Sequence, residues 1–296
     1  MSTKLSNASK AAVFAVLVLL LALAAGLVIN AVAITSEFIV AAVYACSPVL
    51  AVLIMLLVAT RDGLSKEGLK MLGLHRMGLS VWWIAIGVTF LVSLVASVIV
   101  WATPLASFVV PEGVGGELIR FLIKVVLFTF TFVLAEEIAW RGYLLPQLLS
   151  VGRTRAMVLV GLIQAAWHMP LIFLSAAVYD IDGNMLIVLP LFFGSFVANS
   201  FFVGYLRLYT GSVWPATLSH SVHNAAWGTL GAFTLTSNPV VVSEYLVGDY
   251  GILIVVGAAA AAIWVGYFLR SGMNKAQLSG ASGEVVAAPD VTAAAK

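Results

Sequence analysis

Charged side chains are scarce in this sequence. Only 9% of its 296 residues are Asp, Glu, Lys or Arg, whereas 62% are hydrophobic. Because a soluble domain carries roughly 25% charged residues, this composition excludes a soluble globular protein and predicts an integral protein of the lipid bilayer. The formal net charge of +2 is too small to favour nucleic acid as a partner.

Cysteine, internal repeats and a familiar metal motif are also scarce or missing. Cys46 is the only cysteine, so no intrachain disulfide can form, and its expected role is that of a small buried apolar residue. The sequence contains no His-Glu-x-x-His stretch, which excludes the usual zinc-protease helix. It shows neither an internal repeat nor a second soluble domain, and related halves are typical of secondary transporters.

Long apolar stretches make up most of the chain and are long enough to cross a bilayer as helices. We therefore predict an all-α, polytopic membrane protein with a bundle of about eight transmembrane helices. The predicted spans are 11–34, 39–60, 81–103, 121–145, 156–178, 186–207, 213–235 and 251–269. Segment 61–80 mixes charged and apolar residues and is predicted to lie at the membrane interface, whereas 104–120 is predicted to be an irregular loop.

The predicted domain organisation is a single transmembrane domain, 11–270, between two cytoplasmic tails. Residues 1–10 form the short N-terminal tail, and the Ala-, Gly- and Ser-rich residues 271–296 are predicted to be disordered. The first apolar stretch also resembles a signal peptide. However, its 24 uncharged residues exceed the usual length of such a core, so we expect a retained helix.

The distribution of positive charge predicts the orientation in the membrane. With a cytoplasmic N-terminus, twelve of the fifteen Lys and Arg residues fall on the cytoplasmic side, and only Arg120 and Lys124 fall outside. Arg141 lies within a span. Because cytoplasmic loops are enriched in Lys and Arg, we predict a multi-pass protein of the cell membrane with both termini cytoplasmic.

The sequence around Glu136 is unusual because it places three ionisable residues inside a predicted span. Glu137 and Arg141 are separated by four residues, so they share a helix face and can form an ion pair. Glu136 lies about 100° around the helix and lacks that partner. Ionised groups at this depth are costly unless they are paired or face a polar cavity, so a functional role is favoured.

Polar residues on two later predicted spans lie at a similar depth. Counting about 1.5 Å per residue from the cytoplasmic helix ends, Glu136, His168, His220 and Asn224 lie about 14, 18, 11 and 17 Å deep, respectively. His220 and Asn224 also share one helix face, while His223 points elsewhere. Each of these residues alone can be explained by interhelical hydrogen bonding. Their joint placement at one depth favours a common site.

Several mechanisms can use this set of residues. Glu136, His168 and His220 offer the oxygen and nitrogen ligands of a zinc site. In a metal-free site, Glu136 and His168 can activate a water molecule while His220 and Asn224 stabilise an oxyanion. We favour the metal-free site and predict no cofactor, because the fixed charge of Arg141 beside the site opposes a bound dication; zinc stays the alternative.

Three other interpretations remain besides the zinc site and the metal-free site. Serine catalysis through Ser219 or Ser221 has little support, because neither a nucleophile elbow nor a Ser–Lys pair accompanies them. The buried Glu and His residues can also form the proton relay of a proton-coupled transporter. In a membrane scaffold, the same polar layer would serve only helix packing.

The motifs resemble those of the CPBP family of intramembrane proteases, also called Abi, which processes CAAX proteins and bacteriocins and includes the Ras-converting CAAX endopeptidase. The family signature is Glu-Glu-x-x-x-Arg, then Phe-x-x-x-His, then His-x-x-x-Asn/Asp. Residues 136–141 and 220–224 match the first and third motifs. The second motif retains His168 but has Gln164 in place of phenylalanine, which puts pocket shape and substrate in question. The resemblance covers about residues 120–230.

The resemblance implies both a fold and an activity. It implies helices that enclose an intramembrane polar cavity. It also implies an endopeptidase that hydrolyses a peptide bond of a membrane peptide or protein, a class that includes CAAX-like and lipidated substrates. By the resemblance, Glu136 and His168 would activate water, and His220 and Asn224 would hold the oxyanion. Glu137 and Arg141 would organise the site. The family also includes bacteriocin-immunity and membrane-anchoring proteins, so an immunity protein or scaffold is the alternative function.

Overall fold

The computed structural model describes residues 5–270 except 176–178 and 180. The predicted C-terminal tail, 271–296, and the first four residues of the predicted N-terminal tail lie outside these residues. In the described part the fold is nearly all-α, as predicted. The helices have the bounds α1 (Asn7–Val32), α2 (Glu37–Leu53), α3 (Lys66–Met71), α4 (Trp82–Trp101), α5 (Val114–Phe130), α6 (Phe132–Glu137), α7 (Leu145–Leu148), α8 (Arg153–Leu174), α9 (Met185–Thr210), α10 (Trp214–Ala232) and α11 (Ile252–Phe268).

Short elements extend or connect these helices. Three π-helices and three 3₁₀-helices occur in the described chain: η1 (Ile54–Ala59), η4 (Ile138–Leu144) and η6 (Val240–Leu246) are π-helices, and η2 (Asp62–Leu64), η3 (Leu79–Val81) and η5 (Leu149–Val151) are 3₁₀-helices. The two-residue strands β1 (Ser107–Phe108) and β2 (Thr234–Leu235) pair antiparallel, with Ser107 opposite Leu235. This pairing joins the loop after α4 to the end of α10.

All eight predicted spans contain helix. Six helical segments in the described chain are long and apolar enough to cross a membrane, which supports a multi-pass membrane protein. The other two predicted spans correspond to α10 and α11. The α10 helix is less apolar because it carries His220, His223 and Asn224, and α11 has only 17 residues, or about 25 Å of helix.

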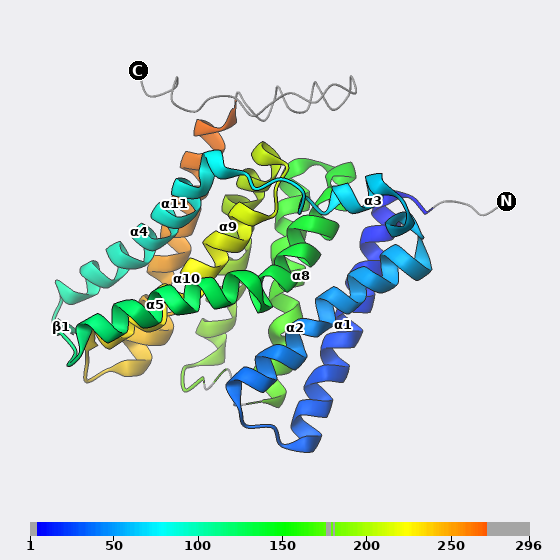
Figure 1. Cartoon of the computed structure of the whole chain (residues 1–296). Helices are drawn as coiled ribbons and strands as arrows, with labels where there is room; N and C mark the ends of the chain where they lie inside the picture. Colours follow the sequence, from blue (N-terminus) through cyan, green and yellow to red (C-terminus); the bar gives the residue numbers. More distant parts are fainter. Residues whose placement is uncertain (1–4, 176–178, 180, 271–296) are drawn as a thin grey trace.

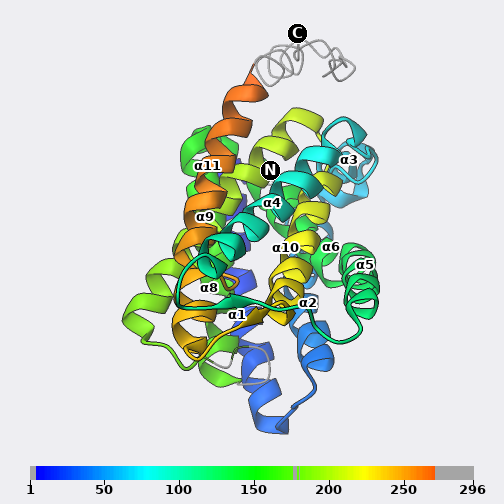
Figure 2. The same cartoon turned by 90° about the vertical axis from the view of Figure 1, so that its left-hand side faces the viewer.

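The span predicted at 121–145 is not one straight helix. It begins earlier, at Val114, and α5 ends at Phe130, where Thr131 adopts φ −126° and ψ −110°. The chain then continues as α6 and the π-helix η4. The apolar sequence gave no sign of this break, because every residue around Thr131 suits a membrane helix. As a result, α5 lies across α10 at the edge of the bundle, and α6 turns inward (Figures 1 and 2).

Two further predictions need correction. Segment 104–120 was expected to be irregular throughout, but it contains strand β1 and the first turns of α5, because Gly113 adopts φ 73° and starts that helix. Cys46 was expected to be buried, but it is exposed on α2, since it lies on the face that turns away from the other helices. The predicted interfacial segment 61–80 contains only the short helices η2, α3 and η3.

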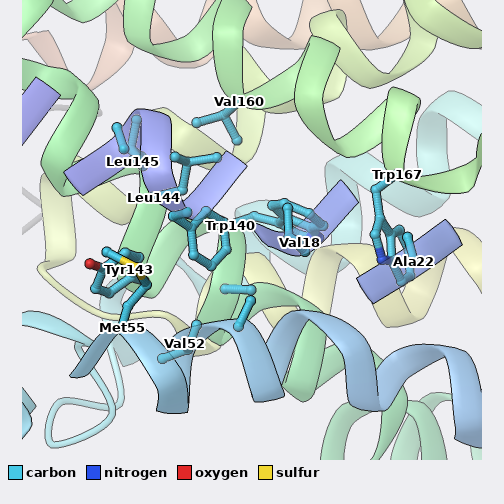
Figure 3. Packing of buried hydrophobic residues seen from close by; sticks show 14 of the residues in the cluster. Val18, Ala22, Val52, Met55, Trp140, Tyr143, Leu144, Leu145, Val160 and Trp167 are labelled. Atoms are coloured by element: carbon cyan, nitrogen blue, oxygen red, sulfur yellow. The ribbon is translucent and has the colours of Figure 1, made fainter. Parts of the chain in front are cut away.

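A hydrophobic cluster fixes the segment that carries the two adjacent glutamates. Trp140 and Tyr143 of η4 are fully buried between α1, α2 and α8. Figure 3 shows Trp140 near Val18 of α1 and Tyr143 near Met55 of η1. Phe14 of α1 adds aromatic contacts to both rings, with centroid distances of 6.2 and 5.1 Å. Because this packing leaves little freedom, the neighbouring polar side chains are held in place.

Candidate active site

Glu137 and Arg141 form the ion pair that their spacing predicts. Arg141 Nη1 donates to Glu137 Oε1 at 2.8 Å, and neither side chain is exposed to any extent. Arg141 lies in η4, where the widened helical turn replaces an α-helical one. Such π-turns often occur at functional sites. The pair therefore sits in a low-dielectric interior, in which removing either partner would leave an uncompensated charge.

The same glutamate oxygen also binds a histidine from a distant part of the chain. His220 Nδ1 of α10 lies 2.9 Å from Glu137 Oε1, so the ring donates its Nδ1–H to the carboxylate. This hydrogen bond joins α6 to α10 and fixes the orientation of the imidazole. The Nε2 atom of His220 is left for other partners.

Gln164 of α8 completes this chain of hydrogen bonds. Its Oε1 accepts a second hydrogen bond from Arg141 Nη1 at 2.8 Å. Its backbone carbonyl lies 2.9 Å from His168 Nδ1. A carbonyl only accepts, so His168 carries a proton on Nδ1, and in its neutral form the Nε2 atom is a free acceptor. Gln164 thus binds both Arg141, the partner of Glu137, and His168.

Aromatic side chains enclose the His168 ring. The ring centroids of Trp167 and Phe196 lie 4.4 and 4.7 Å from that of His168. Trp167 is held in turn by Ser47, because its Nε1 donates to Ser47 Oγ at 2.8 Å, and by Tyr44, whose hydroxyl donates to its carbonyl oxygen. Helices α2 and α9 therefore position His168 through this aromatic shell.

Arg207 of α9 binds the backbone next to the site. Its Nε donates to the backbone carbonyl of Arg141 at 3.0 Å, and its Nη2 donates to the carbonyl of Met71 at 2.7 Å. These contacts connect the backbone of η4 and the end of α3 to α9. The sequence placed Arg207 only among the charges of the cytoplasmic side, so this contact was not predicted.

One cavity of about 510 Å³ brings the predicted catalytic residues together. Glu136, His168, His220 and Asn224 all contribute to its wall, although they come from α6, α8 and α10. The remaining wall is largely apolar and aromatic, with Phe38, Phe128, Phe132, Trp167, Phe196 and Trp227 among its residues. The four residues that the sequence predicts at a similar depth thus border one cavity, and their catalytic roles stay a prediction.

Glu136 differs from its neighbour in its partners. Glu137 is fully buried and shares one oxygen between Arg141 and His220, whereas Glu136 lines the cavity. The buried Oε2 atoms of both glutamates lack a hydrogen-bond partner among the described residues, so the place of Glu136 in the cavity wall is what distinguishes it. A carboxylate that lines a cavity can accept a proton from a bound molecule.

A second carboxylate–imidazole pair lies in the same cavity wall. His223 Nε2 of α10 contacts Asp249 Oδ1 at 2.7 Å, and both residues line the cavity. The sequence suggested that His223 points away from the His220–Asn224 face and serves helix packing. It gave no reason to connect His223 with Asp249, which lies 26 residues further on, just before α11.

The serines considered as nucleophiles have other roles. Ser219 Oγ lies 2.8 Å from Thr89 Oγ of α4, and Ser221 Oγ donates to the carbonyl of Thr217 at 2.8 Å. Both serines are buried, and neither contributes to the cavity wall. These contacts connect helices and satisfy buried hydroxyl groups, so the site geometry gives no support to serine catalysis.

The predicted zinc ligands do not form a compact ligand set. Within residues 5–175, 179 and 181–270, no three His, Cys, Asp or Glu side chains are grouped closely enough to hold a metal ion. Glu136, His168 and His220 are therefore not grouped as tetrahedral coordination requires, since all three would have to converge on one point. The Nδ1 contacts of His168 and His220 with Gln164 and Glu137 leave both Nε2 atoms available, so the metal-free site stays a prediction.

Fold and cavity together define a polytopic α-helical membrane protein in which carboxylate, imidazole and amide side chains meet between the helices. Residues 118–226 match the family model described as type II CAAX prenyl endopeptidase Rce1-like. This match confirms the resemblance to the CPBP family, and it supports a CAAX-type intramembrane endopeptidase in general. The matched segment includes all three motifs but not Asp249. No curated protein and no solved structure matches the chain.

Proposed function

We propose that the protein hydrolyses a peptide bond of a membrane-associated substrate, such as a prenylated peptide, by means of a water molecule activated by Glu136 and His168. One observation carries the proposal: Glu136, His168, His220 and Asn224 line a single cavity in a protein that matches the CAAX endopeptidase family. The partly apolar wall of that cavity suits a lipid-modified peptide.

Glu136 is the general base in this mechanism. Its carboxylate takes a proton from water as the resulting hydroxide attacks the carbonyl carbon of the scissile bond. His168 orients the water, because its Nδ1 is bonded to the Gln164 carbonyl and its Nε2 can accept the second water proton as a hydrogen bond. An apolar enclosure strengthens both interactions by lowering the local dielectric constant.

His220 and Asn224 stabilise the tetrahedral intermediate. The side-chain amide of Asn224 and the Nε2–H of a protonated His220 donate hydrogen bonds to the developing oxyanion. The contact between His220 Nδ1 and Glu137 fixes the orientation of the ring and therefore the direction in which its Nε2–H points. When the C–N bond breaks, Glu136 transfers the proton that it took from water to the leaving amine. The carboxylate of Glu136 is thereby regenerated at the end of the cycle.

Glu137 and Arg141 act as positioning residues. Arg141 holds one oxygen of Glu137, and that oxygen holds His220. Neither lines the cavity, so neither contacts substrate. The proposed reaction needs no metal and takes place in the cell membrane, with both termini of the protein in the cytoplasm.

The Glu136→Gln variant tests the proposal. The substitution keeps the volume and one hydrogen-bonding oxygen but removes the base, so it should abolish hydrolysis of a farnesylated peptide with little change in folding. Hydrolysis is measured by the release of the C-terminal fragment from a quenched peptide, and folding by thermal unfolding in detergent. Metal analysis of active wild-type protein accompanies the assay, and stoichiometric zinc required for activity would contradict the metal-free mechanism.

The alternatives give different results in the same experiment. A scaffold or immunity protein would cleave no peptide in either form, and Glu136→Gln would alter only its stability. A proton-coupled transporter would instead show substrate uptake into proteoliposomes that depends on Glu136. We favour the endopeptidase, because the described cavity joins a base, an imidazole and two oxyanion donors.

A further inference from the structure

The chain between α3 and η3 is attached to the C-terminal end of α9 by hydrogen bonds. Both elements lie at the same end of the bundle (Figure 1). Four residues at the end of α9 and the start of α10 donate to backbone carbonyls of the other segment: Arg207, Ser212, Val213 and Trp214 bind the carbonyls of Met71, Arg76, Gly73 and Leu74, respectively. The segment therefore has a defined conformation, and the proposed reaction gives it no role.

Arg207 brings a buried positive charge to this contact. Its side chain is only 9% exposed, and its Nε and Nη2 atoms donate to the carbonyls of Arg141 and Met71. Within the described part of the chain, Nη1 has no hydrogen-bond acceptor and no carboxylate pairs with the guanidinium group. The other fully buried arginine, Arg141, is balanced by Glu137. Because a buried charge without a counterion is costly, a bound anion would stabilise Arg207.

Arg76 places a second guanidinium group at the same point. A Cβ atom on Gly211 would lie 3.2 Å from Arg76 Nη1 and 3.9 Å from Arg207 Nη1, so at most about 7 Å separates the two nitrogen atoms. Gly211 adopts φ 64° and has no side chain, which leaves the space between them open. Two guanidinium groups at this separation can each donate to a different oxygen atom of one phosphate group.

The surroundings of the two arginines suit the surface of a membrane. The segment 61–80 combines cations with exposed apolar side chains, namely Leu64, Leu69, Met77 and Leu79, which are 73, 52, 45 and 65% exposed. Such a segment lies at the interface, with its apolar side chains among the acyl chains and its cations among the lipid headgroups. Basic pockets between membrane helices at this level bind phosphate-bearing headgroups.

We propose that Arg76 and Arg207 bind the phosphate of an anionic lipid headgroup where the segment after α3 meets the end of α9. This inference concerns lipid binding and does not rest on the proposed function. It has a consequence for the candidate active site, because Arg207 also donates to the backbone carbonyl of Arg141. A headgroup on Arg207 would therefore stabilise the part of the fold that holds the Glu137–Arg141 pair.

Titration of the purified full-length protein in neutral detergent tests the site. Phosphatidylglycerol and phosphatidylcholine are added separately, and bound lipid is counted by native mass spectrometry. Wild-type protein should bind phosphatidylglycerol more tightly, and Arg76→Gln should raise the Kd for this lipid about tenfold, the size expected for one charge-assisted hydrogen bond. Arg76 is the residue to change, because its side chain is exposed, whereas Arg207 also supports the backbone.

Thermal unfolding gives a second readout. A ligand that binds only the folded protein raises its unfolding temperature by mass action. Phosphatidylglycerol should therefore raise the unfolding temperature of wild-type protein more than that of Arg76→Gln, and phosphatidylcholine should affect both equally. Equal affinity of the two proteins for phosphatidylglycerol, with equal shifts in unfolding temperature, would overturn the inference.

Lys66→Gln is the matched control, because it removes an exposed cation from the same interfacial segment, at the start of α3. It should change the Kd for phosphatidylglycerol by less than about twofold, since exposed charges at a surface contribute little individually. Equal losses of affinity in Lys66→Gln and Arg76→Gln would mean that the segment attracts anionic lipid only through its overall charge, and the assigned site would be wrong.

Inorganic phosphate distinguishes a lipid from a soluble ligand. It should not displace phosphatidylglycerol at concentrations similar to that of the lipid, because the headgroup is held in addition by its acyl chains. Displacement by equimolar inorganic phosphate would show that the two arginines bind a soluble phosphate compound, and the assignment to a lipid would be wrong.

Discussion

Adjacent glutamates have different environments, and the difference originates in one hydrogen-bonded oxygen. Glu137 Oε1 accepts from Arg141 and from His220, and this glutamate is fully buried. Glu136, one residue earlier, faces the cavity instead. Because neighbouring helical residues point about 100° apart, a single Glu-Glu pair can supply both a structural carboxylate and a cavity carboxylate.

Gln164 is expected to support both stability and catalysis. The Gln164→Leu variant removes the acceptor for Arg141 Nη1 and leaves a buried donor with fewer partners, which should cost about 1–3 kcal/mol of unfolding free energy. Because Arg141 holds Glu137 and thereby His220, we also expect kcat to fall by about tenfold to a hundredfold. Thermal unfolding and peptide hydrolysis measure the two effects.

A second buried glutamine provides the control for this prediction. Gln147 of α7 is 3% exposed and contacts Met71 Sδ, away from the cavity wall. Gln147→Leu should lower stability slightly and leave kcat nearly unchanged. Equal losses of kcat in both variants would mean that Gln164 contributes only to packing.

Spacing along one helix could be predicted from the sequence, whereas contacts between helices could not. The i, i+4 pairs predicted for Glu137 with Arg141 and for His220 with Asn224 follow from helix geometry alone. The hydrogen bond from Arg141 to Gln164 depends on how α8 approaches η4, and no sequence pattern encodes that approach. The pairing of His223 with Asp249 was missed for the same reason.

At the level of elements, the close contact between α8 and α9 positions His168. A Cβ atom on Gly161 of α8 would lie 2.7 Å from Val197 Cα and 2.8 Å from the Phe196 carbonyl oxygen. Real Cβ atoms do not approach backbone atoms so closely, so only glycine permits this distance between the two helices. Phe196 also contacts His168, which links the helix contact to the site.

Gly161→Ala should therefore separate α8 from α9. We expect a loss of about 1–3 kcal/mol, typical of overpacking, and reduced hydrolysis because the shell around His168 moves. Gly87→Ala is the control: Gly87 lies in α4 with no atom within 4 Å of its potential Cβ, so the change should be neutral or stabilise by about 0.5–1 kcal/mol. Unfolding in detergent distinguishes the variants, and similar stability of both would argue against a tight α8–α9 contact.

Hydropathy predicted where helices occur but not where they break. The eight predicted spans all contain helix, because long apolar runs must satisfy their backbone hydrogen bonds internally in a membrane. The break at Thr131 was not predicted, since it results from α5 packing across α10 while α6 packs against α2. Tertiary packing decides such breaks, and residues 121–141 contain neither a proline nor a glycine that would mark the position of Thr131.

For the molecule as a whole, the arrangement agrees with an even number of spans. Helix α1 begins and α11 ends at the end of the bundle where α3 lies, while the paired strands β1 and β2 lie at the opposite end (Figure 1). The charged segment around α3 is predicted to be cytoplasmic. Both ends of the described chain would then face the cytoplasm, as the distribution of Lys and Arg also predicts.

Reporter fusions test this topology. Fusions after residues 70, 153, 209 and 275 should report a cytoplasmic location, and those after residues 36, 112, 181 and 245 an external one. An external signal at residue 70 or 153 would contradict the predicted orientation. Cleavage of the first stretch, detected as a shortened N-terminus by mass spectrometry, would contradict a retained first helix.

The hydrogen bond between Glu137 and His220 has a consequence for biosynthesis. The two residues are 83 positions apart, so a ribosome that adds about 5–20 residues per second completes His220 about 4–17 s after Glu137. Arg141 follows Glu137 almost at once and can neutralise it on the same helix while the chain inserts. The nascent protein therefore lacks the two proposed oxyanion donors, His220 and Asn224, until α10 has been made, and the proposed hydrolysis would begin only at a late stage of its own synthesis.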